Sequence, residues 1–164
     1  MIIEALAICT VLKIGAPVGR SKMMWEPKQI TFDTGTNIIM YEITEEERAL
    51  LERVVMSEAG NQDYDAQEAV ATVVLNRVFC PDKFGDNIKD VINAEGQFST
   101  HDNGFPTVSC RLAVHNALQF YGGPCQLIPS QIYYFRSGHY HDFAMDYCRF
   151  DDLYFSAPKD ACLD

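Results

Sequence analysis

The sequence predicts an α+β domain that is mainly α-helical and carries a small β element at its C-terminal end. Two observations lead to this class. Residues 44–123 hold four segments with helical spacing of apolar residues or with helix start and stop signals. Residues 131–138 and 151–157 are aromatic segments typical of strands, and they could pair around the loop between them.

Length and composition narrow the class of protein. A chain of 164 residues with 48% hydrophobic residues is long enough for one globular domain with a substantial core. Its net charge of −10 argues against nucleic acid or an anionic membrane surface as the main partner. The six cysteines form no CxxC pair, which disfavours a structural zinc site and leaves disulfides and free buried thiols both open.

Residues 1–42 are predicted to be an N-terminal extension or arm, and residues 43–164 the compact domain. The first dozen residues are apolar but too few for a membrane-spanning helix, so a leader remnant, a docking segment and a flexible arm all stay open. Residues 29–43, QITFDTGTNIIMYEI, could form one or two short strands or an extended arm.

The first helix of the domain is predicted to begin at a capping box. Thr44 is the expected N-cap, and Glu47 stands at the third helical position. An apolar stripe at helical spacing follows, formed by Leu50, Leu51, Val54 and Val55. Glu58 comes four residues after Val54 and three after Val55, so it should project from this stripe toward the core.

The second helix is predicted to start near Asp65, with Asp65 and Glu68 in the positions of another capping box. Its small apolar face should pack closely against the first helix in an antiparallel pair. The short polar loop GNQDY then places Glu58 at the mouth of the pair. The residues of this face are Ala66, Ala69, Val70, Val73 and Val74.

Two further helices complete the predicted helical part. A short third helix within residues 87–96 should end at Gly96. The fourth, within residues 109–123, should end at Gly122 and Gly123. Its expected inner face consists of Leu112, Ala113, Ala117 and Phe120.

Glu58 is the strongest candidate for catalysis. A carboxyl group placed among Val and Leu side chains loses water, which disfavours its charged form. A protonated acid is what cleavage of a glycosidic bond needs, because the leaving oxygen must receive a proton. The alternative is that Glu58 turns outward and binds a helix end or Arg77.

Three pairs of residues are candidates for binding a sugar. Gln97 and Phe98 follow Gly96 in a loop and could supply amide and stacking contacts, unless they form a plain turn. Thr72 and Asn76 lie one turn apart at the edge of the apolar face of the second helix, where they could reach Glu58 or bond locally. Tyr133 and Tyr134, followed by Phe135, alternate along a predicted strand, and aromatic rings stack well on sugars.

The segment GHYHDFAMDYC also permits a metal site, with His139, His141, Asp142 and Cys148 as ligands. It shows no second ligand pair, so no metal and no cofactor are expected. A nucleophilic pair of Cys148 with a neighbouring histidine stays open, although no motif supports it.

Three stretches resemble the cell wall hydrolase family of the SleB spore-cortex-lytic enzymes. They are LLERVVMSEAGNQDYDAQEAVATVVLNRV, VINAEGQFS and IYYFRSGHYHDFAMDYCRFDDLYFS, in the expected order within residues 44–157. The resemblance implies a lysozyme-like, mainly α fold. It implies action at the bacterial cell wall on peptidoglycan glycan strands, between N-acetylmuramic acid and N-acetylglucosamine. Secretion and release as a phage or prophage lysin are both compatible routes to the wall.

Members of this family resemble lytic transglycosylases with one catalytic glutamate, which corresponds to Glu58 here. Such an enzyme leaves 1,6-anhydromuramyl ends, unlike glycosidases with two carboxylates. Asp63 or Asp65 could supply a second carboxylate, so a hydrolytic muramidase stays open. A wall-binding module that keeps the fold without turnover is the third interpretation.

Overall fold

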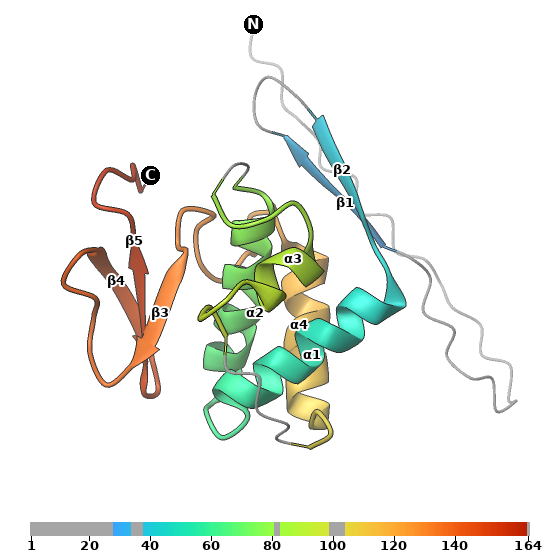
Figure 1. Cartoon of the computed structure of the whole chain (residues 1–164), viewed down its shortest axis with the longest axis horizontal. Coiled ribbons are helices and arrows are strands. Elements are labelled where there is room, and N and C mark those ends of the chain that lie inside the picture. The colour runs from blue at the N-terminus through green and yellow to red at the C-terminus, as the bar shows by residue number, and fades with distance from the viewer. Residues whose placement is uncertain (1–27, 34–37, 81–82, 99–103, 164) are drawn as a thin grey trace, which may run out of the picture.

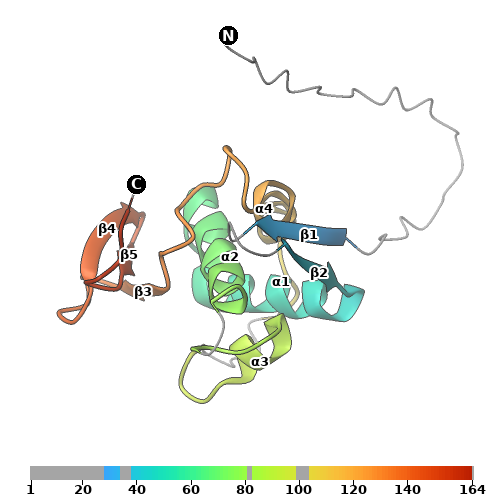
Figure 2. The ribbon, with the colours of Figure 1, turned by 90° about the horizontal axis from the view of Figure 1, so that it is seen from above.

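A computed structural model describes residues 28–33, 38–80, 83–98 and 104–163. Four helices form the body of the protein, and a three-stranded sheet lies on one side of them (Figure 1). A two-stranded hairpin leads into the first helix from the side opposite to the sheet, as both views of the ribbon show (Figure 2). This is the predicted mainly α arrangement with a small C-terminal sheet.

Helix α1, Glu45–Ala59, begins at the predicted capping box. Thr44 has extended backbone angles, its side chain accepts a hydrogen bond from the Glu47 main-chain N–H, and the Glu47 side chain accepts from the Thr44 N–H. The buried side of the helix is the predicted stripe, with Ala59 added and Leu50 only half-buried. Glu58 therefore lies in the last turn, beside the buried face.

Helix α2, Tyr64–Val78, is the central helix. Every residue from Ala66 to Val78 is buried, because α1, α3, α4 and the segment before the sheet surround it. Its N-cap is Asp63, whose carboxylate accepts from the Ala66 N–H at 2.8 Å, so the predicted cap at Asp65 is wrong by two residues. The error arose because both aspartates precede Ala66, and the backbone becomes helical at Tyr64.

Helices α3, Ile88–Asn93, and α4, Val108–Phe120, follow as predicted, although α3 ends before Gly96. The predicted inner face of α4 is partly wrong, since Leu112 is 51% exposed and Phe120 is 38% exposed. The helix is rotated so that Ala113 and Ala117 stay inward and larger apolar residues flank them. The buried set is Cys110, Ala113, Val114, Ala117 and Leu118.

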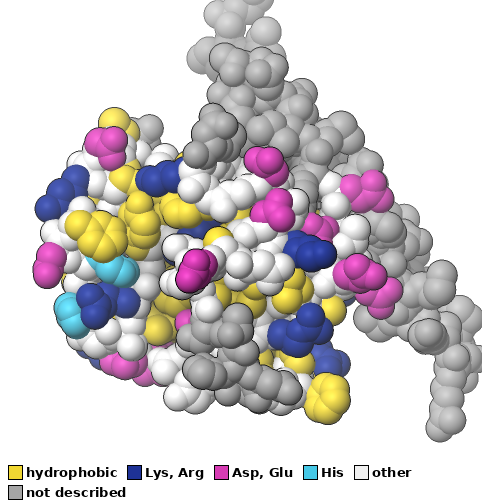
Figure 3. Space-filling view, in the orientation of Figure 1, with side chains coloured by type: hydrophobic (Ala, Val, Ile, Leu, Met, Phe, Trp, Pro, Cys, Tyr) yellow, Lys and Arg dark blue, Asp and Glu magenta, His cyan; other side chains and the backbone are white. Residues whose placement is uncertain are grey.

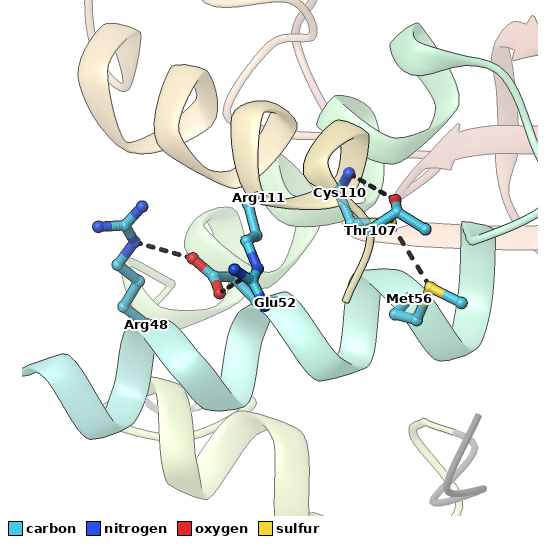
Figure 4. Close-up of polar contacts among 6 residues, drawn as sticks. All are labelled: Arg48, Glu52, Met56, Thr107, Cys110 and Arg111. Carbon is cyan, nitrogen blue, oxygen red and sulfur yellow. Dashed lines mark hydrogen bonds and ion pairs between the residues drawn. The ribbon is translucent and has the colours of Figure 1, made fainter. Parts of the chain in front are cut away.

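Polar contacts hold α1 against the first turn of α4 (Figure 4). Glu52 lies between two arginines, with Arg48 Nε at 2.9 Å and Arg111 Nε at 3.9 Å. Thr107 caps α4 by accepting from the Cys110 N–H at 3.2 Å, and Cys110 Sγ lies 3.9 Å from Met56 Sδ on α1. The contacts of Glu52 with Arg111 and of Met56 with Cys110 join the two helices, and Met56 lies two residues before Glu58.

The strands form two separate antiparallel sheets. In the hairpin, β1 (Lys28–Asp33) pairs with β2 (Ile38–Ile43), within the stretch where one or two strands were predicted. In the C-terminal sheet, β3 (Tyr134–Ser137) pairs with β5 (Leu153–Ala157), which confirms the predicted pairing. The intervening segment is not only a loop, because β4 (Met145–Phe150) pairs with the other edge of β5.

Glu68 gives the fold a pH dependence that can be measured. Burial raises the pKa of this carboxyl group, so the folded state favours its protonated form. The contribution of the Glu68 carboxyl group to the free energy of unfolding is greatest below its pKa in the unfolded state. This contribution is lost as the pH rises through its pKa in the folded state. We expect Glu68→Gln, which cannot ionise, to unfold at higher urea concentration than the natural protein near pH 7 and at the same concentration near pH 4. The exposed Glu46→Gln serves as control, and an equal gain at both pH values would contradict the assignment.

Candidate functional site

A cleft of about 440 Å³ opens where the end of α1 meets the C-terminal sheet. It is built from five parts of the chain that are far apart in sequence. The α1–α2 corner, α2, the loop after α3, β3 and β5 all contribute. The lining residues are Glu58, Gln62, Arg77, Gln97, Phe135, Arg136, Ser137 and Leu153.

Glu58 and Gln97, two of the site residues predicted from sequence, both line the cleft. Glu58 is half-buried in the last turn of α1, and Gln97 lies in the turn after α3. Among the residues that line the cleft, Glu58 provides the single carboxyl group. Asp63 is occupied as the α2 cap and Asp65 is exposed, and neither lines the cleft.

Arg77 organises the wall behind these two side chains. It is 5% exposed, and its Nε donates to the Tyr133 carbonyl at 2.8 Å while an Nη donates to Gln97 Oε1 at 3.2 Å. Its guanidinium also lies over the rings of Phe84 and Phe98, at 5.1 and 4.9 Å. Burial lowers the pKa of Arg77 to about 10, and the neighbouring Tyr134 and Glu58 oppose that shift.

Gln62 links the helical body to the sheet. Its Oε1 accepts from the Asp152 main-chain N–H at 3.1 Å, and its own carbonyl accepts from Gln67 Nε2 at 3.1 Å. The turn between β4 and β5 is therefore tied to the α1–α2 corner. This hydrogen bond connects the helical side of the cleft to the sheet side.

Of the predicted aromatic residues, Phe135 lines the cleft, whereas Phe98, Tyr133 and Tyr134 do not. Phe98 lies behind Gln97, with its ring centroid 6.2 Å from that of Phe135, and Phe135 is the aromatic residue of the cleft wall. Tyr133 and Tyr134 pack instead in a cluster with Phe84, at 5.5 and 6.3 Å between centroids. Of the three consecutive aromatic residues, Phe135 therefore lines the cleft and the two tyrosines do not.

Thr72 and Asn76 are also displaced from their predicted role. Both are 1% exposed and neither lines the cleft, so neither side chain can touch a ligand there. Thr72 Oγ1 donates to the Glu68 carbonyl at 2.9 Å, and Asn76 Nδ2 donates to the carbonyls of Pro129 and Ile132, each at 2.9 Å. Asn76 therefore anchors the segment that enters β3.

Four polar members of the cleft were not predicted as site residues: Gln62, Arg77, Arg136 and Ser137. Arg136 and Ser137 directly follow the predicted aromatic run, which was their one local signal. Within the described ranges, no three His, Cys, Asp or Glu side chains meet in a way that could hold a metal ion. No helix in the described part of the chain is both long and apolar enough to cross a membrane.

The catalytic domain of the Bacillus cereus SleB protein matches with a TM-score of 0.57 at 20% identity, over 69% of this chain and 91% of that one. The catalytic domain of the germination-specific lytic transglycosylase SleB from Bacillus anthracis matches with a TM-score of 0.52 at 19% identity, over 70% of this chain and 96% of that one. These matches show the same fold. No protein with a curated description matches the chain.

The model of the cell wall hydrolase family matches residues 61–155, a span that holds most of the cleft and begins three residues after Glu58. The match covers more than half of the chain and agrees with the fold of the SleB catalytic domains. The chain therefore belongs to the cell wall hydrolase family.

Proposed function

We propose that residues 43–164 form a catalytic domain that cleaves peptidoglycan glycan strands between N-acetylmuramic acid and N-acetylglucosamine, as a lytic transglycosylase. The observation that carries the proposal is that Glu58, half-buried, provides the one carboxyl group among the described residues of the cleft, which it lines together with the polar side chains of Gln62, Gln97 and Ser137. A polar cleft of this kind suits a sugar substrate that needs one proton donor. The structural relative from Bacillus anthracis is itself a lytic transglycosylase.

The reaction needs one group that acts first as acid and then as base. Protonated Glu58 gives its proton to the glycosidic oxygen, and the bond between this oxygen and C1 of the muramic residue breaks. The C6 hydroxyl of the same residue then bonds to C1 and returns its proton to the Glu58 carboxylate. The products are a new N-acetylglucosamine end and a 1,6-anhydromuramyl end. Water is not consumed, so a second carboxylate to activate water is not required.

Other groups of the cleft would position the substrate. Gln97 is held by Arg77, and its amide can pair with an acetamido group of the sugar. Phe135 offers an apolar ring for the face of a sugar, and its own ring packs 5.8 Å from that of buried Phe155. Both side chains are supported from behind, so little ordering is needed when the strand binds.

Mass spectrometry of digested peptidoglycan tests the proposal. We expect muramic ends that are one water lighter than ordinary reducing ends. Reducing muramic ends would replace the proposal by a hydrolytic muramidase. Intact strands together with measurable binding would replace it by a wall-binding module.

A further inference from the structure

We infer that Arg136 is a carboxylate-binding subsite of the cleft and that it takes the acidic substituent of the muramic residue. The inference rests on the proposed function and names the part of the substrate that this side chain recognises. A muramic residue carries a lactyl group that ends in a carboxyl group. This group is either free or joined to a peptide that has carboxylates of its own, and both sources offer the same chemistry.

Arg136 is placed and available for such a role. It projects from β3, lines the cleft together with Glu58, and is exposed. Among the described residues, no carboxylate lies within ion-pair distance of its guanidinium. A planar guanidinium matches a carboxylate with two parallel hydrogen bonds, which is a geometry that a lysine cannot offer.

The charge of the cleft differs from the charge of the protein. The chain carries a net charge of −10, yet the described residues of the cleft supply two guanidinium groups and one carboxyl group. Arg77 is buried and donates to Tyr133 and Gln97, so Arg136 is the accessible cation among the lining residues that the structure describes. Figure 3 shows the His side chains and several Lys and Arg side chains over the sheet side of this face, with scattered Asp and Glu side chains among them, and both signs of charge over the helical side. An anionic ligand repelled by the molecule as a whole is therefore attracted at this position.

The positive charge of Arg136 also acts on the nearby side chain of His141. Burial lowers the pKa of His141, and Arg136 is the next largest cause, followed by His139 and Arg77. His141 therefore favours its neutral form beside Arg136. The geometry also fits the chemistry, because the bond that Glu58 would cleave and the lactyl substituent belong to the same muramic ring. One cleft must then hold an acid for the bond and a cation for the substituent.

The test compares soluble glycan strands whose carboxyl groups are intact with the same strands after amidation by carbodiimide and ammonia. We expect amidation to raise KM about tenfold for the natural protein, with kcat nearly unchanged, because the contact is made equally in the ground and transition states. Bulk repulsion by an acidic protein predicts the opposite, since amidated strands are less anionic. Arg136→Gln should show the higher KM with intact strands and no further change with amidated ones.

Two preparations of strands identify the source of the carboxylate. Strands stripped by an amidase keep the lactyl carboxylate alone, whereas stem-bearing strands keep those of the peptide. An effect of amidation on stripped strands assigns the lactyl group, and an effect confined to stem-bearing strands assigns the peptide. Either result supports the subsite.

Arg53→Gln is the matched control, because Arg53 is an exposed arginine of α1 that does not line the cleft. An equal KM for intact and amidated strands with the natural protein would overturn the inference. An identical loss in Arg53→Gln, or a loss in Arg136→Gln that persists with amidated strands, would also overturn it. Calorimetry can measure binding of intact and amidated strands to Glu58→Gln, a variant that should not cleave them. If the natural protein does not cleave glycan strands, the proposed function is refuted, but this binding measurement still tests Arg136 as a carboxylate subsite.

Discussion

Glu58→Gln is expected to lower turnover of peptidoglycan by at least about 10³-fold while the protein stays folded and binds glycan strands as before. Glutamine keeps the shape of the side chain but can neither give a proton to the glycosidic oxygen nor take one from the C6 hydroxyl. Because Glu58 would serve both halves of the reaction, both are lost together. The release of soluble fragments measures turnover, and sedimentation with insoluble peptidoglycan measures binding.

The control is Glu46→Gln, the same substitution at an exposed position in the first turn of the same helix. It should leave turnover unchanged, because Glu46 does not line the cleft. Retention of most activity by Glu58→Gln would remove Glu58 from the mechanism. Loss of binding together with activity in a folded variant would make Glu58 a binding residue instead.

Arg77→Met is expected to lower the free energy of unfolding by about 3 kcal/mol and to reduce turnover as well. Methionine fills part of the volume but leaves the Tyr133 carbonyl and the Gln97 amide without their donor. The guanidinium contacts with the rings of Phe84 and Phe98 are lost too. Urea unfolding measures the stability, and steady-state kinetics with soluble strands measure the effect on Gln97.

Arg53→Met is the matched control on an exposed surface, and its effect should stay within about 0.5 kcal/mol. Arg77→Lys adds a second comparison, since it keeps the charge but cannot reach both acceptors in the same fork. It should fall between the natural protein and Arg77→Met. Equal stability of all three proteins would show that Arg77 does not organise the wall of the cleft.

The residues of α2 explain why part of the predicted site was wrong. An amphipathic helix would leave Thr72 and Asn76 at the edge of an exposed face, and the prediction assumed such a helix. The α2 helix is instead enclosed by its neighbours, so its polar side chains must be satisfied by main-chain carbonyls. Periodicity within one helix carries no information about how many neighbours that helix has.

The strand β4 was missed for a related reason. Its residues are half-buried or exposed, with Asp146 and Arg149 among them, so the segment lacks the apolar alternation of a strand with one buried face. It becomes a strand because β5 presents a second edge for pairing. Whether such a segment forms a strand depends on a pairing partner elsewhere in the chain.

Local sequence patterns were enough to predict three features: the Thr44 capping box, the apolar stripe that ends beside Glu58, and the aromatic segments that become β3 and β5. Which side chains share the cleft could be seen only once the elements were packed together. Gln62, Arg77, Gln97 and Arg136 come from separate elements, and their proximity depends on packing around α2 and on the contact between Gln62 and Asp152. Hydrogen-bonded turns and helical periods act over a few residues, whereas a cleft is set by contacts between segments that the chain brings together only when the core forms.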